Sequence, residues 1–213
     1  MDILYEDEAL IFVDKPAGMV VQRSHDATEP VLVEVVAEYL KEKAERCFMM
    51  QRLDRGTTGV IFFTKLASIN GAVTRQFERK RLRKRYLALA EGQLAEAQTI
   101  EAPLTRIGPI SFGVRAGGKQ SATSLTTLAF SPRASFLHIH LRTGRTHQIR
   151  VHLAAIGHPL VGDWLYGERN ASRPMLHAST IEMIHPLSQQ PLEVSSPLPE
   201  DFLSAARERG LAI

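Results

Sequence analysis

The sequence has only one cysteine, Cys47, among its 213 residues. No intramolecular disulfide can form, and a zinc site built from cysteines is excluded. A chain without disulfides fits a reducing compartment. We therefore expect Cys47 to be a small residue of the core or of a helix end.

Long apolar segments are also missing. No run approaches the roughly 20 residues that a membrane-spanning helix needs, and residues 1–7 are acidic, unlike a secretory signal peptide. We expect a cytoplasmic protein without membrane contact. Hydrophobic residues make up 44% of the chain and charged residues 23%, values typical of a globular protein.

Common ligand-binding patterns are absent as well. Neither a Walker-type phosphate loop nor a dinucleotide-binding glycine pattern occurs. His147 and His152 are five residues apart, whereas a spacing of four would place both on one face of a helix. His138 and His140 share a strand face, but no third ligand lies at a suitable spacing. A metal site is therefore not expected.

Positive charge is concentrated in one segment. Residues 79–85 carry six cations in seven positions, although the formal net charge of the chain is only +3. Acidic residues cluster elsewhere, around residues 6–8 and 34–45. This segregation favours a polyanionic partner, while a solvated helix end is the alternative that the basic run alone leaves open.

The pattern of apolar and turn residues predicts an α+β fold. Strands are expected at residues 3–5, 10–13, 60–63, 86–90, 136–142, 176–184 and 192–195. Helices are expected at residues 30–40, with Pro30 in the first position, and at residues 67–79, 146–156 and 200–208. Gly117-Gly118 marks a turn, and Gly157 marks a helix end. Without repeats or linkers, residues 1–213 are expected to form one domain.

One candidate for chemistry is Asp54, within residues 51–59 (Gln-Arg-Leu-Asp-Arg-Gly-Thr-Thr-Gly). The segment precedes an apolar run that begins at Val60, and a loop entering a core strand can hold a side chain in place. Arg52 and Arg55 flank the carboxylate and favour its ionised form. An ionised, positioned carboxylate can act as a nucleophile or a base. The alternative is an ordinary turn aspartate that accepts backbone N–H groups, and spacing alone favours it.

A second candidate is Arg150, in a segment where a strand ends at Thr143-Gly144 and a helix begins. Arg150 lies beside the apolar face of that helix and is expected to be partly buried. A buried cation needs a carboxylate partner, and Asp54 is available. The alternative is an arginine whose charged end reaches solvent at the helix edge.

Five segments occur in the order and spacing of a known family. They are residues 14–18 (Asp-Lys-Pro-Ala-Gly), 52–59, 84–86 (Lys-Arg-Tyr), 144–163 (beginning Gly-Arg-Thr-His-Gln-Ile-Arg-Val-His) and 176–178 (Leu-His-Ala). Together they resemble the RluA-type RNA pseudouridine synthases, over about residues 3–202. One such motif would be weak evidence, but five in order are specific.

The resemblance implies a mixed, largely antiparallel sheet in two halves with flanking helices and a central RNA-binding cleft. It also implies a reaction, in which the N1–C1′ bond of a uridine is broken, the base turns over, and C5 is joined to C1′. No cofactor or metal is implied. The expected partner is a tRNA or rRNA stem-loop, and we expect a monomer.

The resemblance also implies roles for single residues. Three residues match catalytic positions: Asp54 the catalytic aspartate, Arg150 the arginine paired with it, and Tyr86 the tyrosine that stacks on the target base and helps to deprotonate C5. Arg52 matches an arginine that occupies the space left by a flipped nucleotide. The whole set expected to bind substrate is Arg52, Arg55, Leu176, Arg83, Lys84, Arg145 and His147.

The sequence departs from the family pattern in places. Gln51 stands where members usually have histidine, and Gly56 where an acidic or small residue is common. Many relatives carry an N-terminal S4 RNA-binding domain, and here the matching pattern starts at about residue 3. We therefore expect the short form, without an S4 domain.

Two other functions remain open at this point. A non-catalytic RNA-binding or RNA-folding protein on the same scaffold would share the basic run, but it would need no set of Arg52, Asp54, Tyr86 and Arg150. A glycoside hydrolase would need a second carboxylate at a defined distance, and no motif supplies one.

Overall fold

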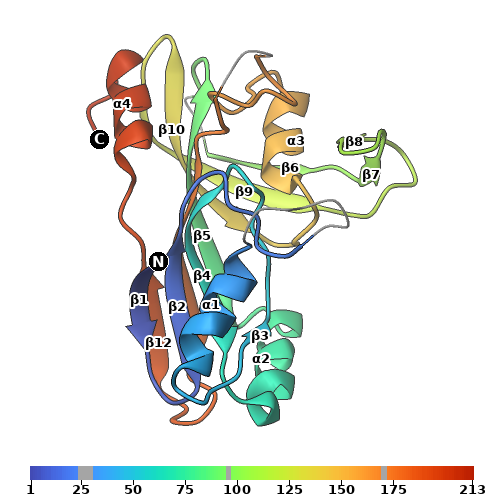
Figure 1. Ribbon diagram of the computed structural model, residues 1–213. Coiled ribbons are helices and arrows are strands. Elements are labelled where there is room, and N and C mark those ends of the chain that lie inside the picture. The colour runs from blue at the N-terminus through green and yellow to red at the C-terminus, as the bar shows by residue number, and fades with distance from the viewer. Residues whose placement is uncertain (24–30, 95–96, 169–171) are drawn as a thin grey trace. The chain divides into compact units, whose positions relative to one another are not determined.

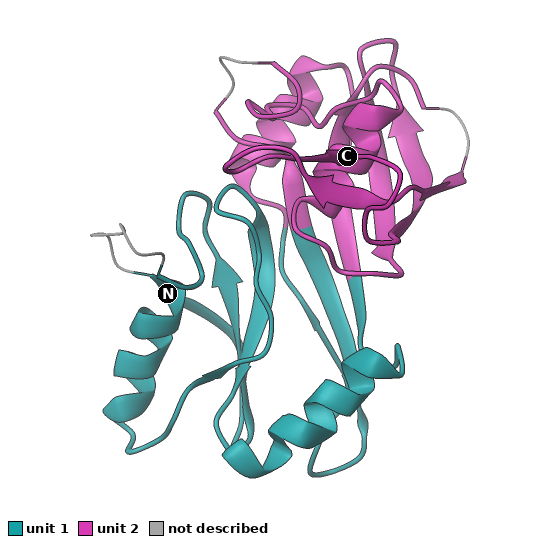
Figure 2. Ribbon diagram, turned by 90° about the vertical axis from the view of Figure 1, so that its right-hand side faces the viewer, with its two compact units in different colours: residues 1–84, 178–197 teal, residues 85–177, 198–213 magenta. Residues whose placement is uncertain are grey.

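The computed structural model describes residues 1–23, 31–94, 97–168 and 172–213. These residues form twelve strands and four helices (Figure 1). The chain divides into two compact units, residues 1–84 with 178–197 and residues 85–177 with 198–213 (Figure 2). Two long strands, β5 (Arg83–Glu91) and β11 (Leu176–Ile184), each have residues in both units.

Unit 1 is built on antiparallel strands. β1 (Asp2–Glu6) pairs with β2 (Leu10–Lys15), β2 with β4 (Thr58–Thr64), and the short β3 (Phe48–Met49) also with β4. β12 (Pro191–Ser195) pairs with β11, which follows β4 in the strand order. Every residue of β4 is buried. This strand is the centre of the unit.

Two helices explain why β4 is apolar on both faces. Ile61 and Phe63 share a core with Leu32, Val36 and Leu40 of α1 (Leu32–Lys41). Val60 and Phe62 share another core with Ile69 and Val73 of α2 (Ala67–Glu78). Alternate residues of a strand point to opposite faces, so α1 and α2 cover opposite faces of the sheet in unit 1 (Figure 2).

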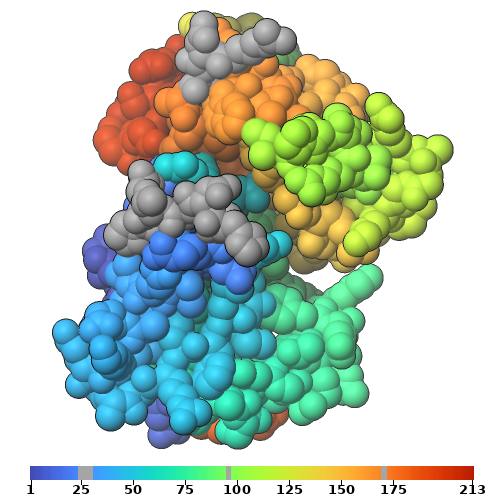
Figure 3. Space-filling view, turned by 45° about the vertical axis from the view of Figure 1, so that its right-hand side comes forward, coloured from blue at the N-terminus to red at the C-terminus, as the bar shows by residue number. Residues whose placement is uncertain are grey.

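Unit 2 contains the second run of antiparallel strands. β5 pairs with β10 (Ala134–Leu141), β10 with β9 (Ala122–Phe130), and β9 with β6 (Gln98–Glu101). A separate hairpin, β7 (Leu104–Arg106) with β8 (Phe112–Val114), lies at the surface of this unit and is drawn bright green in Figure 3.

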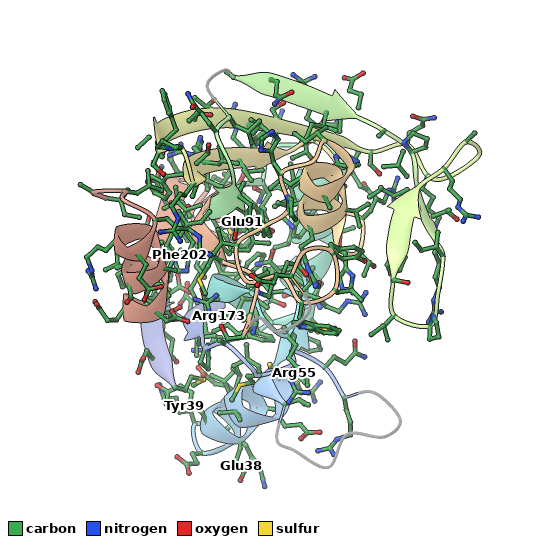
Figure 4. The ribbon with its side chains drawn as sticks, turned by 90° about the horizontal axis from the view of Figure 1, so that it is seen from above. Glu38, Tyr39, Arg55, Glu91, Arg173 and Phe202 are labelled. Carbon is green, nitrogen blue, oxygen red and sulfur yellow. The ribbon has the colours of Figure 1, made fainter. Side chains whose placement is uncertain are left out.

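Helices α3 (Gln148–Ala155) and α4 (Glu200–Glu208) complete unit 2. Phe202 of α4 (Figure 4) is fully buried and packs with Leu89 and Phe136, which lie on β5 and β10. The C-terminal helix is thus part of the core of unit 2.

The predicted α+β class with a largely antiparallel sheet is confirmed. The predicted start of the third helix at residue 146 was wrong, because His147 has a left-handed backbone (φ 56°) and α3 begins at Gln148. The predicted position of Pro30 lies outside the described residues, and α1 begins at Leu32. No helix in the described parts of the chain is long and apolar enough to span a membrane.

Candidate active site

Asp54 lies in unit 1, in the loop that joins β3 to β4. The side chain is half-buried, and the N–H of Thr57 donates to the backbone carbonyl of Asp54 at 3.1 Å, which closes a turn. Leu53, the residue before it, packs against the core beneath α1. Asp54 therefore sits between an apolar anchor and the buried strand β4.

The buried side chain of Lys15 supports this loop through hydrogen bonds to backbone carbonyls. Its side chain is fully buried, and its Nζ donates to the carbonyl oxygens of Pro16 at 2.9 Å, Met19 at 2.7 Å and Arg55 at 3.2 Å. A buried ammonium needs such acceptors because it has lost its hydration. Lys15 thereby joins the segment at residues 14–19 to the residue that follows Asp54.

Gly18 adds two further bonds between the same segments. The Gly18 N–H donates to the carbonyl of Arg55 at 2.9 Å, and the Arg55 Nε donates to the carbonyl of Gly18 at 2.8 Å. Arg55, labelled in Figure 4, was predicted to bind substrate, and the structure gives its side chain this structural contact. The sequence supplied no physical reason to connect residues 15 and 55.

Gly59 fixes the end of the loop. Its φ is +108°, and a Cβ atom at this position would lie 2.2 Å from the carbonyl oxygen of Ala178 in β11. Both the backbone conformation and the close approach require glycine. The loop that carries Asp54 is consequently anchored at both of its ends.

Two buried polar groups flank Asp54. The side-chain amide of Gln51 and the hydroxyl of Thr57 have no hydrogen-bond partner among the described residues. Both residues are buried, with exposed fractions of 8% and 2%. A buried polar group without a partner costs roughly 1–3 kcal/mol, and such groups are rare in folded proteins.

Arg150 lies on α3 in unit 2, and it is 5% exposed. Its Nε and NH2 groups donate to the two carboxylate oxygens of Asp163 at 2.7 and 2.8 Å, and Asp163 is fully buried. As expected for a buried cation, Arg150 has a carboxylate partner, and that partner is Asp163, to which the sequence gave no role. A pairing of Arg150 with Asp54 would join residues of two units, and it stays a prediction.

Tyr166 completes the surroundings of Arg150. Its ring centroid lies 5.0 Å from the guanidinium carbon. Its hydroxyl accepts the N–H of Phe112 at 2.9 Å and lies 2.8 Å from Nδ1 of His147. The structure thus brings His147 and Arg150 together with two residues, Asp163 and Tyr166, that the sequence analysis had not singled out for chemistry.

The remaining candidates of unit 2 lie on separate elements. Tyr86 is buried on β5 opposite Ile139 of β10, and Leu176 is buried at the start of β11. Arg145 is exposed, and its backbone N–H donates to Gln148. Their expected roles in binding the substrate stay predictions.

The basic run spans the end of α2 and the start of β5. The exposed cations are Arg79, Lys80, Arg81 and Arg83. Lys84 differs, because it is half-buried with its Nζ 5.5 Å from the ring centroid of Phe77, and burial lowers the pKa of its ammonium. Lys84 is accordingly a weaker candidate for phosphate binding than Arg83.

Comparison with known proteins agrees with these features. The family model described as RNA pseudouridylate synthase matches residues 9–155, a range that includes the loop of Asp54 and the helix of Arg150. The chain belongs to the RNA pseudouridylate synthase family. The RluA-type resemblance is confirmed, and members of this family are isomerases.

Two curated relatives show the extent of the similarity. The chain is 35% identical over 216 residues to the "Uncharacterized RNA pseudouridine synthase YhcT" of Bacillus subtilis, covering 97% of this chain and 72% of that protein. It is 36% identical over 217 residues to the "Ribosomal large subunit pseudouridine synthase D" of Nitrosomonas europaea, covering 95% of this chain and 63% of that protein.

Solved structures share the fold. Human RNA Pseudouridylate Synthase Domain Containing 1 has a TM-score of 0.76 at 26% identity, covering 92% of this chain and 82% of that chain. Human RNA Pseudouridylate Synthase Domain Containing 4 has a TM-score of 0.82 at 20% identity, covering 100% and 94%. The pseudouridine synthase fold is therefore shown.

Proposed function

We propose that this RNA pseudouridine synthase isomerises a uridine of ribosomal RNA or tRNA, with Asp54 as its catalytic carboxylate. The observation that carries the proposal is the anchored loop, in which Leu53 before Asp54 packs against the core and buried Lys15 binds the carbonyl of Arg55 after it. A rigid support of this kind suits a group that must meet a reacting atom in a defined geometry.

The reaction needs no external reactant. The N1–C1′ bond breaks, the uracil turns over, C5 bonds to C1′, and the proton on C5 is lost while N1 gains one. Two roles for the carboxylate fit this balance. Asp54 attacks a carbon of the nucleotide, or it removes the proton from C2′ of the ribose.

Ribosomal RNA is the favoured substrate class. Several relatives are named ribosomal large subunit pseudouridine synthases. A uridine in a stem must leave the helix before its C1′ and C5 can be reached, which costs a few kcal/mol. In the proposal, Tyr86 stacks on the extruded base, Arg150 pairs with Asp54, and Arg52 fills the space that the nucleotide leaves.

A non-catalytic RNA-binding protein is the competing function. The exposed cations of the basic run serve either function, because they bind phosphates regardless of chemistry. The loop around Asp54 favours the enzyme over the binding protein, because RNA binding alone does not need a carboxylate that is held in a fixed position.

The decisive comparison uses wild type and Asp54→Asn, which keeps the size of the side chain and removes its charge. Both proteins are incubated with total tRNA and with ribosomal RNA, and pseudouridine is mapped by chemical labelling and primer extension. We expect a specific mark with wild type, no mark with the variant, and similar RNA affinity for both. No mark from either protein would favour the binding protein, and the same mark from both would show that Asp54 is not the catalytic carboxylate.

A further inference from the structure

The guanidinium of Arg150 is held on two sides within unit 2. The carboxylate of Asp163 binds the edge formed by Nε and NH2 at 2.7 and 2.8 Å, and the ring of Tyr166 lies against the face, 5.0 Å from the central carbon. Because the five N–H groups of a guanidinium lie in one plane, these contacts fix the direction of the opposite edge. A second carboxylate has to approach that edge.

Asp163 is itself fixed before it meets the arginine. It is fully buried, and its Oδ1 also accepts the N–H groups of Leu165 at 3.1 Å and Tyr166 at 3.2 Å. The preceding Gly162 has φ +76°, and a Cβ there would lie 2.1 Å from the carbonyl oxygen of Arg173. The turn therefore presents a carboxylate whose position is set by its own backbone.

Tyr166 connects Arg150 to a second element. Its hydroxyl accepts the Phe112 N–H of β8 at 2.9 Å and lies 2.8 Å from Nδ1 of His147, within hydrogen-bonding distance. The rings of Phe112 and His147 also meet edge to face, with centroids 5.6 Å apart. One side chain thus contacts the arginine, the β7–β8 hairpin and the residue that precedes α3.

We propose that Asp163 and Tyr166 are positioning residues for the pseudouridine synthase reaction. Asp163 sets the plane of the Arg150 guanidinium, and Tyr166 supports its face and ties its helix to the β7–β8 hairpin. Neither residue touches the substrate; both act through Arg150. The inference rests on the proposed function, in which Arg150 pairs with the catalytic carboxylate.

A purely structural role is the alternative, and unit 2 supplies a matched control for it. Arg173 and Asp201 form another bidentate pair, with Nε–Oδ2 and NH2–Oδ1 distances of 2.5 and 2.7 Å. Asp201 has no contact with Arg150 among the bonds described. Asp163→Asn and Asp201→Asn each remove the carboxylate of a bidentate arginine pair, and only the first pair involves the arginine of the site. The Asp201 side chain is 52% exposed whereas Asp163 is fully buried, so the control matches the geometry of the pair and not its burial.

The test measures single-turnover pseudouridine formation with enzyme in excess, at a temperature where circular dichroism shows every variant folded. We expect Asp163→Asn to lower the rate constant at saturating enzyme by about tenfold or more, because small displacements of a catalytic group are costly. Asp201→Asn should stay within about twofold of wild type. The dissociation constant for the RNA should change little in both.

Variants of Tyr166 test the positioning role independently if Asp163→Asn does not fold. Tyr166→Leu removes the ring and the hydroxyl and should lower the same rate constant by about tenfold. Tyr166→Phe keeps the ring and should lose less. The inference is overturned if Tyr166→Leu reacts at the wild-type rate, if Asp163→Asn and Asp201→Asn lose rate equally, or if the losses appear only in RNA affinity. Failure of the proposed function is a different result, namely no pseudouridine from wild type or full activity in Asp54→Asn.

Discussion

The buried ammonium of Lys15 donates a hydrogen bond to the carbonyl oxygen of Arg55, the residue after Asp54, at 3.2 Å. The same ammonium binds two carbonyls of its own segment. A fully buried lysine is rare unless it is paired. Through these bonds the segment at residues 14–19 supports the loop that carries Asp54. The sequence of the segment does not reveal this role.

Replacing Lys15 tests whether its hydrogen bonds support the fold and the loop around Asp54. Lys15→Met should lower the free energy of unfolding by about 1.5–3 kcal/mol, because hydrogen bonds to a charged group are lost. It should also slow pseudouridine formation, since the loop around Asp54 loses a support. Lys119→Met, at an exposed position, is the control for removal of a charge. A Lys15→Met protein with wild-type stability and rate would show that the hydrogen bonds of Lys15 are not needed for either.

Two buried glutamines offer a contrast in hydrogen bonding. Gln51 has no partner for its amide among the described residues. Gln148 uses its amide fully, accepting from Thr143 and Arg145 and donating to Ala122 and Thr123. The free energy of unfolding should therefore respond to the same substitution with opposite sign at the two positions.

The paired variants are Gln51→Met and Gln148→Met, compared by urea unfolding. Gln51→Met should stabilise the protein by about 1 kcal/mol, because it removes the cost of an unpaired buried amide. Gln148→Met should destabilise it by about 1–3 kcal/mol, because its partners are left unpaired. Equal destabilisation by both would indicate that Gln51 has a partner in solution.

His152 gives the fold a dependence on pH. It is fully buried; its Nε2 donates to the carbonyl of Ala102 at 3.1 Å, and its Nδ1 accepts from the hydroxyl of Thr123 at 2.9 Å. Burial lowers the pKa of this imidazole, and the bond to Ala102 opposes the shift only in part. The folded state therefore binds a proton less readily than the unfolded state.

The sign of the effect follows from that difference. At pH 8 the imidazole is neutral in both states, and below about 6.5, its ordinary pKa, the unfolded state gains protons first. Stability should consequently fall as the pH drops below about 6.5, by at most about 1.4 kcal/mol per pH unit for this group. His152→Gln should flatten the curve of unfolding free energy between pH 6.5 and 5.

A second histidine has to be controlled in that experiment. Burial lowers the pKa of His138, and the nearby positive charges of Arg85 and His140 lower it further. The curve should therefore be measured for His138→Gln and for the double variant. A wild-type slope in the His152→Gln single variant and in the double variant would refute the assignment.

The basic run makes a prediction about salt dependence. Arg81 and Arg83 are exposed, whereas Lys84 packs against Phe77. Each phosphate contact that is lost lowers the slope of log affinity against log salt by about 0.7–0.9. Arg81→Gln with Arg83→Gln should flatten the slope of RNA binding, and Lys84→Gln should change it less. The reverse order would show that Lys84 turns toward the RNA when it binds.

The sequence predicted the elements whose signal is local. β4 has an unbroken apolar run because helices cover both of its faces, and β11 and α4 have the bounds expected from their patterns. The start of α3 was missed because the left-handed His147 is held by Tyr166 and Phe112. Contacts over such separations leave no periodicity in a sequence.

Prediction of the site from the sequence meets the same limit, because contacts between distant residues leave no local pattern. Asp54 and Arg150 were singled out by their surroundings in the sequence and by the family motifs. Asp163 ends the family segment at residues 144–163, but it was given no role, because spacing does not show which carboxylate pairs with Arg150. The contact of Lys15 with Arg55 joins residues 40 positions apart, and only the folded strands β2 and β4 bring them together.

Release of the hydrogen on C5 tests the central claim most directly. When C5 of uracil is joined to C1′, the hydrogen on C5 passes to water, so RNA labelled with tritium at C5 of uridine reports each turnover. Wild type should release tritium from labelled ribosomal RNA or tRNA, and Asp54→Asn should release none above the enzyme-free control while still binding the RNA. Release at the wild-type rate by Asp54→Asn, or no release by wild type from either RNA, would contradict the account.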